Sequence, residues 1–156
     1  MGKTPERKLE KYWNNGILSW ISIADIKNNS LSKTKEMISQ SALDTVFKGM
    51  FSPVGTLIMS FKLSIGKTAI LNIDATHNEA IISIYPFAES AILKKWLLHI
   101  LPIVANKSET VSAIKGRTLN SRKIDLLEIA LPPVAEQIMI IATIEQLNQL
   151  FQNLVQ

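Results

Sequence analysis

The sequence predicts an α+β fold: a mixed, twisted sheet with short flanking helices, followed by a long C-terminal helix of the coiled-coil type. Short apolar strands and helical stretches alternate without the regular rhythm of βαβ units, which favours a mixed sheet. The pair Pro132-Pro133 then separates this body from an apolar-periodic tail that reaches Gln156. We therefore expect two parts, a body at residues 1–132 and a helix at residues 133–156.

Five segments have the alternating or β-branched composition of strands. They are residues 20–23, 56–61, 68–73 and 80–85, with a last strand at 127–131. Between them we expect a polar loop at 25–39, a short helix at 41–49 that ends at a glycine, and a helix at 89–101. A second short helix should begin near Ser108, and a loop at 116–121 follows it.

The tail after the two prolines has the pattern of a projecting helix. Proline ends the preceding element and is tolerated in the first turn of the next helix, where Glu136 suits the positive end of the dipole. Apolar residues at alternating spacings of four and three form a predicted coiled-coil seam: Ile140, Ile144, Leu147, Phe151 and Leu154. We expect this seam to bind a second copy or a partner subunit. The alternative is a terminal helix that packs on its own domain, helped by Ile138, Ile141 and Leu150.

Charge is unevenly distributed between the two parts. All 17 Lys and Arg precede Pro133, with 11 of the 13 Asp and Glu, and the only charges after it are Glu136 and Glu145. A basic body is the electrostatic footprint of a protein that binds a polyanion such as nucleic acid. Cysteine is absent, the first residues do not resemble a signal peptide, and no apolar run is long enough to span a bilayer. We expect a soluble, cytoplasmic protein with no membrane partner.

Several motifs resemble catalytic sites but lack residues that the chemistry needs. Gly66-Lys67-Thr68 matches the end of a phosphate-binding loop, yet Phe61 stands where that loop needs its first glycine. Leu131-Pro132-Pro133-Val134 has the prolines of the adenine methyltransferase loop without its amide and aromatic side chains. The two histidines, His77 and His99, are far apart in the chain. We predict no catalytic residue, no metal site and no cofactor, so the chain is not an enzyme on its own.

Four segments, in this order and spacing, resemble the specificity (S) subunits of type I restriction-modification systems. They are Trp20–Asp25 with the preceding Tyr12-Trp13, the strand-loop-strand at 55–70, the polar element Asn78-Glu79-Ala80, and the stretch from Gly116 to Gln137. The last stretch resembles the end of a target recognition domain and the start of the spacer helix. A whole S subunit has two such domains and two helices, and more residues ahead of the segment that is Gly2–Pro5 here. The chain therefore looks like a half-subunit or a fragment.

The resemblance implies a target-recognition-domain-like fold and a non-catalytic role. In this family each recognition domain reads one half of a bipartite DNA site, and paired spacer helices set the gap between the halves. Methyltransferase (M) and restriction (R) subunits carry out methylation and cleavage. We expect double-stranded DNA and the M and R subunits as partners, and a homodimer through the C-terminal helix that restores the two-fold arrangement.

Two basic loops are the predicted DNA contacts. The first contributes Lys62, Ser64, Gly66 and Lys67, whose small residues allow the backbone to approach phosphates. The second contributes residues suited to guanine and adenine: Lys115, Arg117, Asn120 and Arg122. A third candidate region comprises Lys27-Asn28-Asn29, Lys33 and Lys35. We expect Trp13, Trp20 and Trp96 to anchor the core or an interface. The competing function is a protein-interaction fragment that assembles through its helix and does not recognise DNA.

Overall fold

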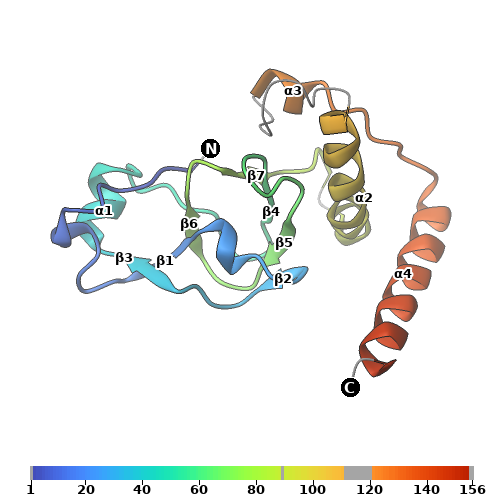
Figure 1. The fold of residues 1–156 in the computed structure, drawn as a ribbon, viewed down its shortest axis with the longest axis horizontal. Coiled ribbons are helices and arrows are strands. Elements are labelled where there is room, and N and C mark those ends of the chain that lie inside the picture. Colours follow the sequence, from blue (N-terminus) through green and yellow to red (C-terminus); the bar gives the residue numbers. More distant parts are fainter. Residues whose placement is uncertain (1, 89, 111–120, 155–156) are drawn as a thin grey trace.

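The computed structural model describes residues 2–88, 90–110 and 121–154. Its elements, in chain order, are η1 (Glu10–Tyr12), β1 (Leu18–Ile21), η2 (Ile23–Asp25), β2 (Ser30–Leu31), β3 (Glu36–Ile38), α1 (Gln40–Thr45), β4 (Leu57–Ser60), β5 (Thr68–Leu71), β6 (Ala75–His77), β7 (Ile81–Ile84), α2 (Ala91–Thr110), α3 (Ser121–Asp125) and α4 (Val134–Leu154). Figure 1 shows a strand-rich body with α2 and α4 at one end. The fold is α+β with a long C-terminal helix, which confirms the predicted class.

The strands form two sheets, and both are mixed. One has the order β3-β1-β6, in which β1 pairs antiparallel with β3 and parallel with β6. The other has the order β2-β5-β4-β7, in which β4 pairs antiparallel with both neighbours and β2 pairs parallel with β5. The parallel pairs join segments that are far apart in the chain, so both sheets depend on contacts between residues distant in sequence.

Strand β4 divides the core because its side chains alternate between two buried faces. Leu57 and Met59 join Leu93 and Leu97 of α2 in one apolar cluster. Ile58 points the other way, into a cluster with residues of β1, β5 and β7. A third cluster surrounds Trp20 and the buried face of α1. Each fully buried aliphatic side chain stabilises the fold by roughly 1.5–3 kcal/mol.

The predicted helix at 41–49 and the predicted strands around β1, β4, β5 and β7 are confirmed within a few residues. The expectation of a polar loop at 25–39 is wrong, because that segment holds β2 and β3. Strand β6 was not predicted either. Each of these strands has only two or three residues, too few for a visible alternation. The strand predicted at 127–131 is also wrong: these residues follow α3 as irregular chain, and Leu127 and Ile129 pack on the core without strand partners.

Helix α2 is longer than predicted and continues through Pro102 to Thr110. The separate helix expected near Ser108 is therefore wrong. Proline has no N–H, so it cannot donate to the carbonyl four residues earlier. That carbonyl, on Leu98, accepts a hydrogen bond from the Thr68 hydroxyl at 2.9 Å. The Thr68 side chain of β5 thus replaces the lost hydrogen bond, and the helix continues past the proline.

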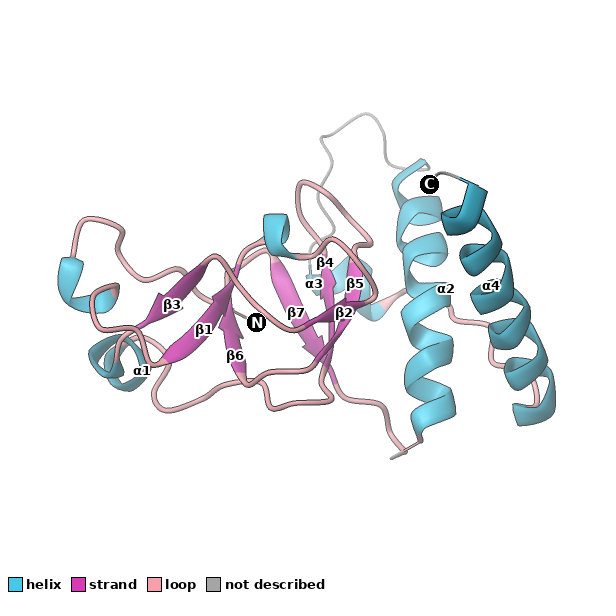
Figure 2. Ribbon diagram, turned by 90° about the horizontal axis from the view of Figure 1, so that it is seen from below, coloured by secondary structure: helices cyan, strands magenta, loops and turns pink. Residues whose placement is uncertain are grey.

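Helix α4 begins directly after the two prolines, as predicted, and lies beside α2 (Figure 2). Gln137 and Ile141 are its buried residues, and the Gln137 side chain donates to the Pro132 carbonyl at 2.7 Å. An ion pair of 2.9 Å joins Lys95 of α2 to Glu145. Part of α4 therefore packs on its own domain. Among the helices of the described residues, none is long and apolar enough to cross a membrane.

Candidate nucleic-acid interface

The loop between β4 and β5 holds Lys67 on the surface of a well-fixed turn. The Ser60 hydroxyl accepts from the Lys67 backbone N–H at 3.1 Å and donates to the Ser64 carbonyl. The Ser60 carbonyl accepts from the Gly66 N–H at 2.9 Å, and the side chain of Ile65 is buried in the core. The backbone before Lys67 is fixed, while its side chain is exposed to solvent.

Gly66 of the same loop is buried against α2. Its φ is +80°, and a Cβ built on it would lie 3.1 Å from both the Pro102 Cα and the Asn106 side-chain nitrogen. The Asn106 amide in turn donates to the Pro102 carbonyl at 2.7 Å. The small size of Gly66 therefore serves the close approach of the loop to the helix. Ser64 is the exposed small residue of the loop. The contact of Gly66 with a phosphate stays a prediction.

The structure brings Lys67 next to the third candidate region. Lys27 and Asn28 line the same shallow hollow as Lys67. The reason is the parallel pairing of β2 with β5, in which the Ile70 N–H donates to the Asn29 carbonyl at 2.9 Å. Two candidate regions that are almost 40 residues apart in the sequence therefore form one surface.

Further lysines extend this surface around the loop after η2. Lys33 and Lys35 line a second hollow together with Lys27 and are exposed. Among the residues that line the two hollows, Asp25 is the one acid. Its carboxylate accepts from the Ser22 N–H and hydroxyl at 2.8 and 2.7 Å, and from the Lys35 N–H at 3.0 Å. We call Lys27, Lys33, Lys35 and Lys67 the basic surface.

Lys62 lies in a different environment from Lys67. Its ammonium is 5.4 Å from the Phe61 ring centroid. A hydrogen bond from the Thr4 hydroxyl and one from the Glu79 backbone lower the pKa of the Glu79 carboxyl, and the charge of Lys62 lowers it further by a smaller amount. Glu79 therefore offsets part of the charge of Lys62.

The second predicted loop lies outside the described residues. This applies to Lys115, Arg117 and Asn120. Arg122 belongs to α3, but its side chain is outside the description as well. Of the tryptophans, Trp20 and Trp96 are buried, and Trp13 packs edge-on against Trp20 with ring centroids 5.3 Å apart. Their predicted role as anchors is confirmed.

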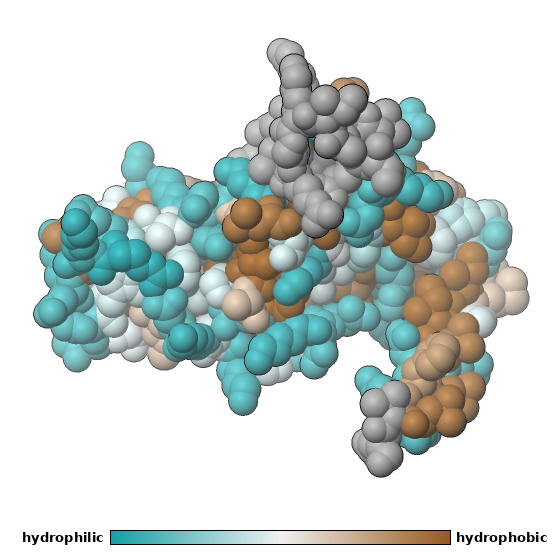
Figure 3. All heavy atoms as spheres, viewed as in Figure 1, coloured by the Kyte–Doolittle hydropathy of each residue, from teal (hydrophilic) through white to brown (hydrophobic). Residues whose placement is uncertain are grey.

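The predicted seam of α4 is divided between the body and solvent. Ile140 and Ile144 are half-buried, whereas Leu147, Phe151 and Leu154 are 48%, 64% and 81% exposed. Figure 3 shows apolar side chains gathered along this helix. Met139 and Leu150 add to the exposed apolar side chains of α4. The C-terminal half of α4 is therefore an unpartnered apolar surface in the described chain.

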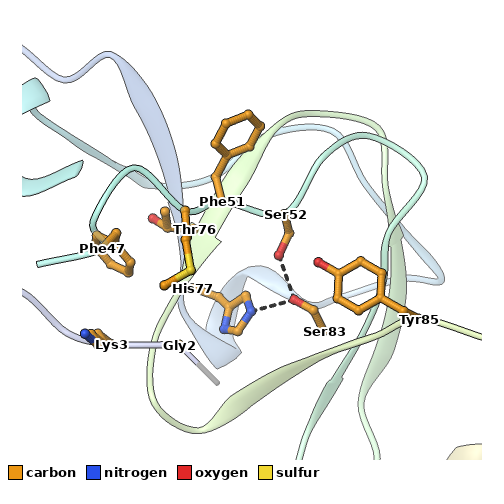
Figure 4. Close-up of a pocket in the computed structure, with 10 residues that line it drawn as sticks. Gly2, Lys3, Phe47, Phe51, Ser52, Thr76, His77, Ser83 and Tyr85 are labelled. Atoms are coloured by element: carbon orange, nitrogen blue, oxygen red, sulfur yellow. Dashed lines mark hydrogen bonds between the residues drawn. The ribbon is translucent and has the colours of Figure 1, made fainter. Parts of the chain in front are cut away.

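One hollow of about 210 Å³ contains polar residues that no sequence motif suggested (Figure 4). His77 Nδ1 donates to the Asn78 carbonyl at 3.2 Å, so Nε2 accepts from the Ser83 hydroxyl at 2.8 Å. Ser83 also shares a 2.6 Å hydrogen bond with Ser52. Burial lowers the pKa of His77, although its hydrogen bond to the Asn78 carbonyl acts in the opposite direction. The residues come from separate segments, and the described residues contain no group of three His, Cys, Asp or Glu that could hold a metal ion.

Solved structures confirm the fold. The chain aligns over 99% of its length with a chain from a structure of complex assembly and conformational transition of the type I R-M system, with a TM-score of 0.68 and 21% identity. It aligns equally far with the HsdS subunit from Thermoanaerobacter tengcongensis, with a TM-score of 0.66 and 22% identity. The alignments cover 36% and 35% of those chains.

Sequence comparison places the chain in a family. It is 25% identical over 159 residues to the type I restriction enzyme MjaIX specificity subunit of Methanocaldococcus jannaschii, an alignment that covers 97% of the chain and 36% of the relative. The chain thus spans about a third of the length of the proteins it matches. The family model for the type I restriction modification DNA specificity domain matches residues 1–155. The chain therefore belongs to the family of type I restriction-modification DNA specificity domains, with a single domain of the target-recognition type.

Proposed function

We propose that this chain recognises one half of a bipartite DNA site and presents that half-site to the catalytic subunits of a type I system. The observation that carries the proposal is the basic surface, where Lys67 and Lys27 share one hollow although they come from distant segments. Asp25, the one acid among the residues that line the two hollows, accepts three hydrogen bonds from backbone and hydroxyl groups. Exposed lysines with no competing free acid are suited to neutralise phosphates.

Base recognition needs side chains beside the phosphate contacts. Asn28 and Asn29 are exposed between Lys27 and β2, and an Asn side chain pairs with adenine through two hydrogen bonds. Arg117, Asn120 and Arg122 remain the second proposed group of base contacts. Ser64 and Lys62 complete the first loop, with Lys67 as its principal phosphate ligand. Gly66 contributes by holding that loop on α2.

Helix α4 is the proposed assembly element. Its exposed residues Leu147, Phe151 and Leu154 match the seam of a coiled coil, and a second copy offers the same surface. Pairing of two chains through α4 would place two recognition domains at the ends of one spacer. We propose domain bounds of 1–132 and 133–156 on this basis, with the M and R subunits as further partners. Methylation and cleavage would then reside in those partners, and this chain would be non-catalytic.

DNA binding is tested with the whole chain and a pool of short randomised duplexes. Selected duplexes should bind well above random competitor DNA, and the affinity should fall steeply with salt. Replacing Lys27 and Lys67 together by Gln should reduce the slope of log K against log[salt] by about two. The matched control is the substitution Lys8→Gln. Lys8 is an exposed lysine just before η1, and η1 contacts α1 at the other end of the body (Figure 1).

The outcomes separate the two functions. A loss of slope in the double variant but not in Lys8→Gln supports DNA recognition by the basic surface. Selection that enriches no duplex, together with self-association through α4, would favour the protein-interaction fragment. Equal slopes for all three proteins would show that DNA binds elsewhere on the body.

A further inference from the structure

Leu63 is an apolar side chain at the tip of the basic β4–β5 loop. It is 76% exposed and lies between Lys62 and the exposed Ser64. Single exposed leucines are common on protein surfaces and carry no meaning by themselves. This one follows Lys62 directly and lies in the loop that presents Lys67.

The backbone of Leu63 is a second, independent observation. Its φ is +62°, in the left-handed region that side chains with a Cβ rarely adopt. Asn15 and Lys48 are the other non-glycine residues with positive φ in the described chain. Asn tolerates this region through its short polar side chain, but leucine has no such compensation. Strain of this kind persists where the surroundings enforce it, and it is concentrated at functional sites.

The surroundings of Leu63 do enforce it. The Ser60 hydroxyl bonds to the Ser64 carbonyl, one residue after Leu63, and to the Lys67 N–H. Ile65 is buried in the core, and Gly66 is pressed against Pro102. The loop therefore cannot fold Leu63 back onto the body without losing these contacts. The β4–β5 loop is therefore rigid, and it carries the apolar side chain of Leu63 at its tip.

The geometry points to Leu63 as a wedge that inserts between neighbouring base pairs of the bound duplex. Side chains of this kind partly unstack a base step and kink the DNA. Unstacking costs free energy, so only a side chain whose backbone is held in place can maintain it. Lys62 before Leu63 and Lys67 after it in the same loop bind phosphates near the step, and the apolar tip is complementary to the exposed faces of the bases. This inference rests on the proposed DNA recognition and adds a deformation of the DNA to it.

The test uses the whole chain and a duplex enriched from the randomised pool. Leu63→Ala and Leu63→Gly remove the tip, Leu63→Met keeps a long apolar side chain, and Leu126→Ala removes a leucine that is 75% exposed outside the loop. Affinity should fall about tenfold in the Ala and Gly variants and stay near the parent value for the other two. With 2-aminopurine placed at successive positions, the parent and Leu63→Met should raise the fluorescence at one step, and the Ala and Gly variants should not.

Stability of the Gly variant provides a separate readout. Because glycine adopts positive φ without strain, Leu63→Gly should unfold at the same urea concentration as the parent or at a higher one. Weaker DNA binding without weaker folding is the signature of strain held for function. If the parent binds DNA and Leu63→Ala binds equally well with the same fluorescence pattern, the wedge is wrong while DNA recognition stands. If replacing thymine by uracil weakens binding to the same extent as Leu63→Ala, without any unstacking, Leu63 contacts a methyl group and the wedge is again wrong.

Discussion

The Thr68 hydroxyl donates to the Leu98 backbone carbonyl at 2.9 Å, and this is the carbonyl that Pro102 leaves without a helical donor. The hydrogen bond ties β5 to the middle of α2 directly beside the basic loop. Gly66 packs on the same proline, so loop and helix form one unit. The position of Lys67 on the surface thus depends on a proline 35 residues later in the chain.

Replacing Thr68 by Val should therefore destabilise the fold. Thr68 is buried, and Val keeps its shape but leaves the Leu98 carbonyl unpaired, which costs about 1–3 kcal/mol of unfolding free energy. In a Pro102→Ala background the new backbone N–H at that position supplies the missing donor, so the same substitution should cost less than half as much. Urea unfolding of the four proteins in this double-mutant cycle measures the difference. Equal costs in both backgrounds would mean that the hydroxyl does not compensate for the proline.

A comparison of two glycines isolates the contact between the loop and α2. Gly66 and Gly49 have similar φ values, +80° and +74°, but a Cβ at Gly49 meets nothing within 4 Å. Gly49→Ala should cost only the strain of a positive φ, about 1–2 kcal/mol. Gly66→Ala should cost more, since its Cβ crowds the backbone of Pro102. Urea midpoints give both values, and an equal loss in the two variants would argue against the close packing of loop on helix.

The sequence predicts those elements whose own residues carry enough signal. Strand β4 contributes apolar side chains to two clusters, and α4 has more than five turns of periodic apolar residues after a proline pair. Strands β2, β3 and β6 each depend on a partner strand that is distant in sequence. Helix α2 was predicted too short because Pro102 is a helix breaker unless a side chain such as Thr68 replaces its lost hydrogen bond.

The same distinction applies to the candidate site. Lys67 is visible in the sequence because it lies in a loop between two strong strands. Its proximity to Lys27 depends on the parallel pairing of β2 with β5, and no local pattern reveals that pairing. A glycine at position 66 indicates only that some group approaches the backbone closely, and the position of α2 shows that Pro102 and Asn106 do so.

His77 should make the stability of the fold sensitive to mildly acidic pH. Burial lowers its pKa from the ordinary value of 6.5, so below that pH the unfolded chain binds a proton more readily than the folded chain. The contribution is present above the ordinary pKa and is lost as the pH falls below it. His77→Gln should reduce the loss of unfolding free energy between about pH 7.5 and about pH 5.5. His99→Gln is the comparison, because burial lowers the pKa of His99 as well, in a half-buried position. An unchanged pH profile in His77→Gln would show that the ring is not desolvated.

Two residues of α4 should separate its packing on the body from its pairing with another chain. Ile141 is 4% exposed beside α2, whereas Phe151 is 64% exposed on the projecting half. Ile141→Ala should lower the unfolding free energy of the domain by about 2–4 kcal/mol at any protein concentration, because it leaves a cavity. Phe151→Ala should change the stability of the dilute monomer by less than about 0.5 kcal/mol, since an exposed side chain loses little.

In sedimentation equilibrium at rising concentration, the parent should dimerise and Phe151→Ala should require a markedly higher concentration, because each chain of a two-fold pair loses the contact. A parent chain that stays monomeric throughout would mean that the exposed half of α4 serves a different partner, and an association equally strong in Phe151→Ala would place the dimer contact outside the seam.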